Sequence, residues 1–108
     1  MRELLRPPEI TGDDEATEMI RVWLAHGDQH VSLLLGMWQD ADDSELDERE
    51  AWGDLLADTI RHIAHGLSQS HGWQPAETIR RISLSLTENL RTDAVGAVTG
   101  GYVGAAGD

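Results

Sequence analysis

The stretch from Glu18 to Trp38 constrains the fold most, because it has the pattern of a β-hairpin. Its two arms are rich in β-branched, aromatic and aliphatic residues, the types that fit a pleated sheet. A Gly27-Asp28 step stands between the arms, and glycine adopts the positive φ that tight hairpin turns require. The sequence therefore predicts an antiparallel hairpin that turns at Gly27-Asp28.

This turn predicts the register of the hairpin and the composition of its two faces. Whether the loop has two residues or the four from His26 to Gln29, Ile20 is expected opposite Leu35. Successive side chains alternate along a strand, so one face is wholly apolar and the other is mixed. The apolar face would hold Ile20, Val22, Leu24, Val31, Leu33 and Leu35. The mixed face would hold Met19, Arg21, Trp23, His30, Ser32, Leu34 and Gly36.

Charge and missing residue types exclude several classes of function. The 108-residue chain has a net charge of −12, which repels phosphate backbones and anionic lipid, so we expect neither a nucleic-acid nor a membrane partner. The absence of cysteine excludes disulfides, thiolate catalysis and cysteine-based metal centres. The absence of lysine excludes Schiff-base chemistry. No apolar run is long enough to span a membrane or to form a signal peptide, so a cytoplasmic location is expected.

Two amphipathic helices are predicted after the hairpin. From about Glu45 to Leu67, apolar residues recur at the spacing that places them on one helix face. Ser44 would cap this helix, with Asp47 as its capping-box partner. After a loop over residues 68–74, a second helix would run from Pro75 to about Arg91 and pack antiparallel to the first. The buried stripe of this second helix would consist of Ile79, Ile82, Ser83, Leu86 and Leu90.

The chain is expected to form one domain with an arm and a tail. Residues 1–17 contain a Pro7-Pro8 step and would form an extended arm, which covers a sheet edge or reaches a second subunit. Residues 18–91 would form a single α+β domain in which both helices cover the apolar face of the hairpin. Residues 92–108 are rich in glycine and lack a hydrophobic period, which predicts a flexible tail.

Arg21, Trp23, His30 and Trp38, on or beside the mixed hairpin face, are the candidate ligand or interface residues. Together they offer flat aromatic area, a cation and hydrogen-bonding groups, which suit either a ligand platform or a protein interface. No catalytic group converges on them, so we favour an interface or contacts within the chain over a small-molecule site. We predict no catalytic residue.

Asp58, His62 and His65 come nearest to a metal site, because their spacing places them along one helix face. The same residues are common on a solvated helix face, where histidines near a helix C-terminus are stabilising. There is no HExxH motif, and a fourth ligand would have to come from elsewhere, such as His71. We therefore predict no bound metal and no cofactor, and keep these three residues only as candidates.

Three segments carry a resemblance to a known family: Glu18–Ala25, Leu35–Trp38, and Ala51–Asp58 with Arg61-His62 following. In this order they resemble DUF5076, a family of small proteobacterial proteins of unknown function. The resemblance covers about residues 16–90. It implies a compact α+β domain without an established activity, so no functional residue is carried over.

We expect a non-catalytic interaction or assembly module that self-associates, because a lone two-stranded sheet is marginally stable and has unpaired edges. In the expected homodimer the hairpins pair edge to edge or the mixed faces pack together, with Trp23 and Trp38 near the contact. A different, unidentified protein could also be the partner. The alternative function is a small-ligand-binding or metal-binding enzyme that uses the mixed hairpin face or the Asp/His helix face.

Overall fold

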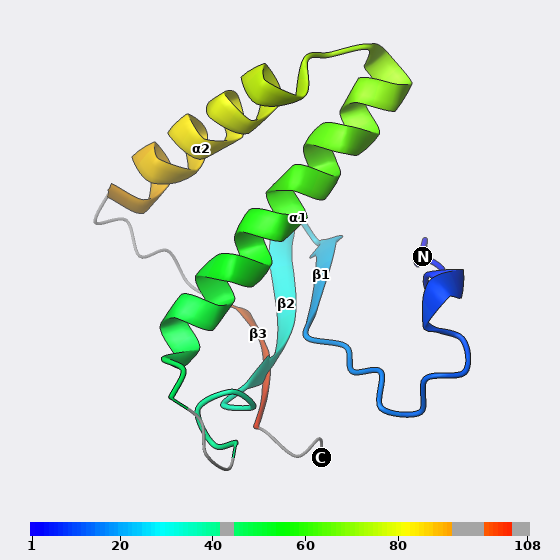
Figure 1. Cartoon of the computed structure of the whole chain (residues 1–108), viewed down its shortest axis with the longest axis vertical. Helices are drawn as coiled ribbons and strands as arrows, with labels where there is room; N and C mark the ends of the chain where they lie inside the picture. The colour runs from blue at the N-terminus through cyan, green and yellow to red at the C-terminus, as the bar shows by residue number, and fades with distance from the viewer. Residues whose placement is uncertain (42–44, 92–98, 105–108) are drawn as a thin grey trace.

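Figure 1 shows the computed structural model of the chain, which describes residues 1–41, 45–91 and 99–104. The fold is α+β, as predicted, with a hairpin followed by two helices. The elements in order are the 3₁₀ helix η1 (Pro8–Ile10), strands β1 (Ile20–Ala25) and β2 (Asp28–Leu35), helices α1 (Glu48–His71) and α2 (Pro75–Arg91), and strand β3 (Thr99–Gly104).

Strands β1 and β2 form an antiparallel hairpin whose turn lies one residue earlier than predicted. The two loop residues are His26 and Gly27, with φ values of 53° and 77°. Positive φ at both positions is the signature of a type I′ turn, and histidine enters this region more readily than most residues. Ile20 therefore pairs with Leu33 instead of Leu35. A shift of two residues keeps each side chain on its predicted face.

A third strand corrects the prediction of a flexible tail. β3 pairs with β2 in parallel, from His30 opposite Thr99 to Leu35 opposite Gly104. The strand order is β1-β2-β3, so β3 occupies the edge of β2 that the hairpin leaves open. The other parts of the predicted tail, residues 92–98 and 105–108, lie outside the described residues.

Helix α1 begins and ends later than predicted. Its N-cap is Asp47, whose carboxylate accepts a hydrogen bond from the Arg49 backbone N–H at 2.9 Å. Ser44, the predicted cap, lies outside the described residues. The helix continues past Gly66 and ends at Gly72, which has a φ of 69° and supplies the left-handed conformation of a common C-terminal cap. The connection to α2 is correspondingly short, and α2 has its predicted bounds.

The two helices are neighbours near their connection and diverge from it (Figure 1). Helix α1 crosses one face of the sheet, whereas α2 lies apart from the sheet. Near the connection, Ala64 and Thr78 are 1% and 6% exposed. Farther along α2, Leu86 and Leu90 are exposed, although the sequence predicted both as buried. The divergence of the helices accounts for this difference.

The chain alone buries few side chains. On the predicted apolar face, Val22 and Leu24 are 50% and 82% exposed, and α2 lies away from the sheet, so the two helices do not together cover this face as predicted. The most buried sheet residue described is Leu34, which belongs to the mixed face. The chain has an accessible surface of 9345 Å², against about 6,000 Å² for a folded monomer of its mass. Its radius of gyration is 16.0 Å, against about 13 Å for a compact domain of this length.

Within the described part of the chain, neither helix combines the length and apolar character needed to cross a membrane.

Candidate functional site

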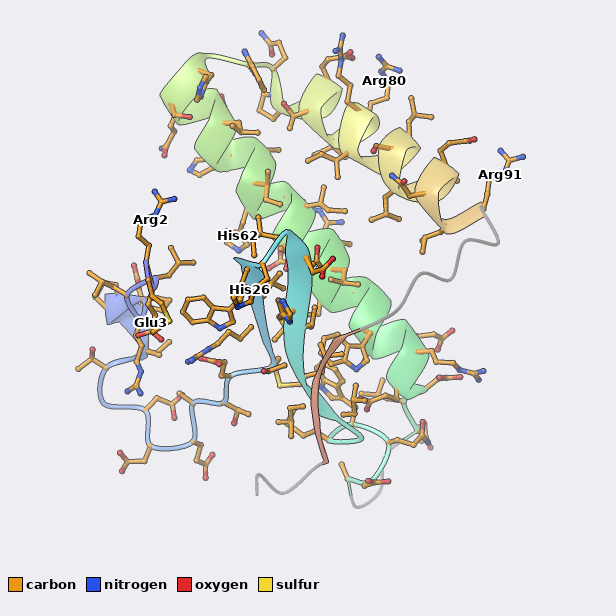
Figure 2. All side chains as sticks on the ribbon, turned by 180° about the vertical axis from the view of Figure 1, so that it is seen from behind. Arg2, Glu3, His26, His62, Arg80 and Arg91 are labelled. Carbon is orange, nitrogen blue, oxygen red and sulfur yellow. The ribbon has the colours of Figure 1, made fainter. Side chains whose placement is uncertain are left out.

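The hairpin brings together three of the four residues predicted around its mixed face. Arg21 lies on the strand next to Trp23, and Trp23 pairs with His30 across the ladder. The Arg21 guanidinium donates to Glu18 at 2.8 Å and reaches Glu3 of the N-terminal arm at 3.5 Å, and Figure 2 shows Glu3 beside the hairpin. The hydrogen bond from Arg21 holds the pKa of Glu18 below its ordinary value.

His30 is also engaged within the hairpin. Its ring atom Nε2 lies 3.1 Å from the carbonyl oxygen of Ala25, within hydrogen-bond distance. The ring is half-buried, as is that of Trp23 opposite it. The cation and the imidazole of this face therefore point to partners in their own chain.

Trp38 does not join this group, because it lies in the loop between β2 and α1. Its ring meets the ring of Trp52 edge to face, with centroids 5.6 Å apart and planes at 87°. This is a favourable geometry for two aromatic rings. The predicted set of four residues therefore divides into a hairpin part and a loop part.

The carboxylate of Glu48, in the first turn of α1, ties this loop to the helix. Its Oε2 accepts hydrogen bonds from the Gly36 backbone N–H and the Trp52 indole N–H, both at 2.9 Å. Its Oε1 accepts from the backbone N–H groups of Trp38 at 3.0 Å and Gln39 at 3.1 Å. In return, the Gln39 side-chain oxygen accepts from the Glu48 backbone N–H at 3.0 Å. We call these five residues the Glu48 clasp.

The electrostatics of the Glu48 clasp favour a charged carboxylate. Burial raises the pKa of Glu48, but the hydrogen bonds from three backbone amides and one indole outweigh it and hold the pKa below its ordinary value. Both carboxylate oxygens are occupied by donors of the same chain. The geometry therefore makes Glu48 a residue that positions α1 against the loop.

Glu48 was not among the predicted site residues. Glu48 and Glu50 lie in the first turn of α1, where acids complement the helix dipole, and this common pattern does not single out Glu48. One local signal was available, because Glu48 and Trp52 stand four residues apart and lie on the same side of a helix. The backbone amides that Glu48 accepts from cannot be read from the residue types.

Neither the helix histidines nor the hairpin turn forms an enclosed site. Asp58 and His62 make the predicted contact four residues apart, with 3.2 Å between Oδ2 and Nε2, and both are largely exposed. His65 lies exposed on the same helix. Among the described residues, no three histidine, aspartate or glutamate side chains gather closely enough to hold a metal ion. A shallow hollow at the hairpin turn is lined by residues 24–29.

A protein-family model described as a domain of unknown function, DUF5076, matches residues 3–93, which is most of the chain. The chain belongs to the DUF5076 family. This match confirms the resemblance seen in the sequence, and it extends into the N-terminal arm. A comparison with curated proteins found no match.

Among solved structures, this DUF5076 chain is similar to one from the photosynthetic bacterium Rhodopseudomonas palustrus CGA009, provisionally named a pyruvate dehydrogenase. The TM-score is 0.63 and the sequence identity is 23%. The match covers 92% of this chain and 93% of that chain. At this identity the similarity shows a shared fold and carries no activity across.

Proposed function

We propose that this DUF5076 chain is a non-catalytic assembly module whose partner is a second copy of itself. The observation that carries the proposal is exposed apolar surface: Leu24 and Leu90 are 82% and 76% exposed. The total surface of the chain is 9345 Å², about one and a half times that of a folded monomer of this mass. Within the described residues, no large side chain is fully buried. Exposed apolar surface is unfavourable in water, and association removes it.

The polar groups of the candidate sites support the same proposal. Arg21 is paired with Glu18, Glu48 with backbone and indole donors, and Asp58 with His62. A catalytic site needs groups that converge on a space where a substrate can lie. These groups converge on partners in their own chain, which leaves apolar surface as the feature that a partner could use.

The net charge of −12 restricts how two copies can meet. Two acidic chains repel each other over roughly a Debye length, about 10 Å at 0.1 M salt. The contact should therefore lie where charges are few or already paired. Added salt should strengthen the association, because it screens the repulsion between the two chains.

Native mass spectrometry and sedimentation velocity of the untagged chain test this proposal. The expected species has twice the chain mass of 11.9 kDa, and its fraction should grow with protein and salt concentration. A monomer at all concentrations up to high micromolar would contradict self-association. A metal ion or small molecule retained as added mass would favour the alternative of a metal- or ligand-dependent enzyme.

A further inference from the structure

Helix α2 has an apolar face and a charged face. Thr78, Ile82, Leu86 and Leu90 follow one another at intervals of four residues, which places them along one side of the helix. At 3.6 residues per turn, all five charged residues fall on the opposite side. These charged residues are Glu77, Arg80, Arg81, Glu88 and Arg91.

Burial of the apolar face decreases from the first turn of α2 to the last. Thr78 is 6% exposed, Ile82 is half-buried, Leu86 is 41% exposed and Leu90 is 76% exposed. Figure 1 shows the reason, because α2 diverges from α1 along its length. The last two turns of α2 therefore present leucines to solvent on the side that its first turn buries.

The charged face of α2 is neutralised within the helix. Glu77 is paired with Arg80 at 2.6 Å and with Arg81 at 2.8 Å, and Glu88 is paired with Arg91 at 3.7 Å. Figure 2 shows Arg80 and Arg91 pointing away from α1. With three arginines and two glutamates, α2 carries a charge of +1 in a chain of −12. A second acidic chain can approach α2 without meeting unpaired acidic groups of this helix.

We infer that a second copy of this chain docks on the exposed end of α2, so that Leu86 and Leu90 of each copy pack against α2 of the other. The inference rests on the proposed self-association and adds the surface that performs it. A two-fold contact uses the same patch on both copies, and an apolar stripe on a helix whose charges are paired with each other is self-complementary in this sense. A stable interface needs about 800 Å² from each partner. The chain as a whole exposes about 3,300 Å² more than a compact monomer of its mass, and the end of α2 is one part of that surface.

The mixed hairpin face, where the sequence predicted the contact, is one competing surface, and the apolar hairpin face with Leu24 82% exposed is another. On the mixed face Arg21 is tied to Glu18 and to the arm, and the Trp38 ring is packed on Trp52. Trp23 is half-buried in the single chain, whereas Leu90 is largely exposed. A contact through the mixed face would therefore gain less apolar burial at these positions than a contact through the end of α2.

The variant Leu90→Asp tests the inference, because Leu90 is so exposed that its replacement removes little packing from the single chain. The matched control is Leu84→Asp, which makes the same change in the same helix at a residue 57% exposed on the charged side. In sedimentation velocity across a concentration series, Leu90→Asp should raise the dissociation constant about a hundredfold or more. Leu84→Asp should change it less than about threefold, and Leu90→Met should keep wild-type affinity.

Circular dichroism of each variant verifies that the helix content is unchanged, so that a lost dimer is not a lost fold.

If the wild type is dimeric and Leu90→Asp associates equally well, the docking surface is wrong while self-association stands. Equal dissociation of Leu84→Asp also overturns it, because the effect would not follow the face of α2. Dissociation by Trp23→Ala with Leu90→Asp still dimeric would place the contact on the mixed hairpin face. A wild type that is monomeric throughout contradicts the proposed function itself.

Discussion

The side chains at the beginning of α1 have partners within the chain, whereas those at the end of α2 are exposed to solvent. At the beginning of α1, one carboxylate accepts four hydrogen bonds and two tryptophan rings meet edge to face. At the end of α2, Leu86 and Leu90 face solvent in the single chain. The polar groups of the first region are hydrogen-bonded within the chain, and the second region has apolar side chains that the described residues leave exposed. Side chains at the beginning of α1 hold the fold, whereas side chains at the end of α2 are accessible to a partner.

Glu48→Ala should break the first region with the largest effect on stability. The substitution removes the acceptor of three backbone amides and one indole, and half-buried donors that lose their acceptor are costly. We expect a larger fall in urea midpoint than for Trp52→Phe or Leu90→Ala. The control is Glu50→Ala, which removes an exposed acid from the same first turn. Equal midpoints for the two variants would show that the Glu48 clasp does not hold the fold.

Acid should weaken the same region. The pKa of Glu48 lies below its ordinary value of 4.5, so its contribution to stability is complete above pH 4.5 and is lost as the pH falls. The pKa of Asp47, the cap of α1, is lowered to about 2 by hydrogen bonds from Arg49. We expect the free energy of unfolding to decline between about pH 4.5 and 2. The decline should be shallower in Glu48→Ala, and an identical slope in both proteins would contradict this assignment.

Trp52→Phe removes one donor from the Glu48 clasp and keeps an aromatic ring at this position. The lost indole hydrogen bond and the smaller ring contact with Trp38 should cost about 1 to 2 kcal/mol in urea unfolding. Trp73→Phe, at an exposed residue in the connection between the helices, should cost less than about 0.5 kcal/mol. A reversed order would place the stabilising tryptophan at the connection.

Leu90→Ala should have the smallest effect on the single chain. At protein concentrations where the chain is monomeric, we expect a change below about 0.5 kcal/mol, because an exposed leucine makes few contacts. A loss of about 2 kcal/mol or more would show that Leu90 belongs to the core of its own chain. The end of α2 would then be packed within its own chain, as the beginning of α1 is.

Local signals in the sequence predicted the helices and the existence of the hairpin. The bounds of α2 are correct, because Pro75 and the apolar spacing both mark it. The hairpin turn was misplaced by one residue, because Gly27-Asp28 has the better local propensity, whereas the structure uses His26 with a positive φ. The exposure of Leu86 and Leu90 was also mispredicted, because periodicity identifies the apolar face of α2 but not its distance from α1.

Non-local pairing was beyond the reach of sequence patterns. Strand β3 is rich in glycine and pairs with a strand that precedes both helices, so no local hydrophobic alternation reports it. The Glu48 clasp likewise joins a helix start to backbone amides of a loop, and backbone donors leave no mark on residue identity. The sequence grouped Arg21, Trp23, His30 and Trp38 around one hairpin face. The structure keeps the first three together and places Trp38 in the loop against Trp52.

The parallel pairing of β3 with β2 has a consequence for the order of folding. The hairpin and the helix pair form from contacts between neighbouring segments, but β3 must close a loop that contains both helices. We therefore expect the sheet to be completed last, during synthesis as well as refolding. Until β3 arrives, β2 presents an open backbone edge that another chain can join. The yield of native protein then depends on whether β3 docks faster than β2 pairs with a strand of another chain. Dilution or slower synthesis slows the pairing between chains and should raise the native yield.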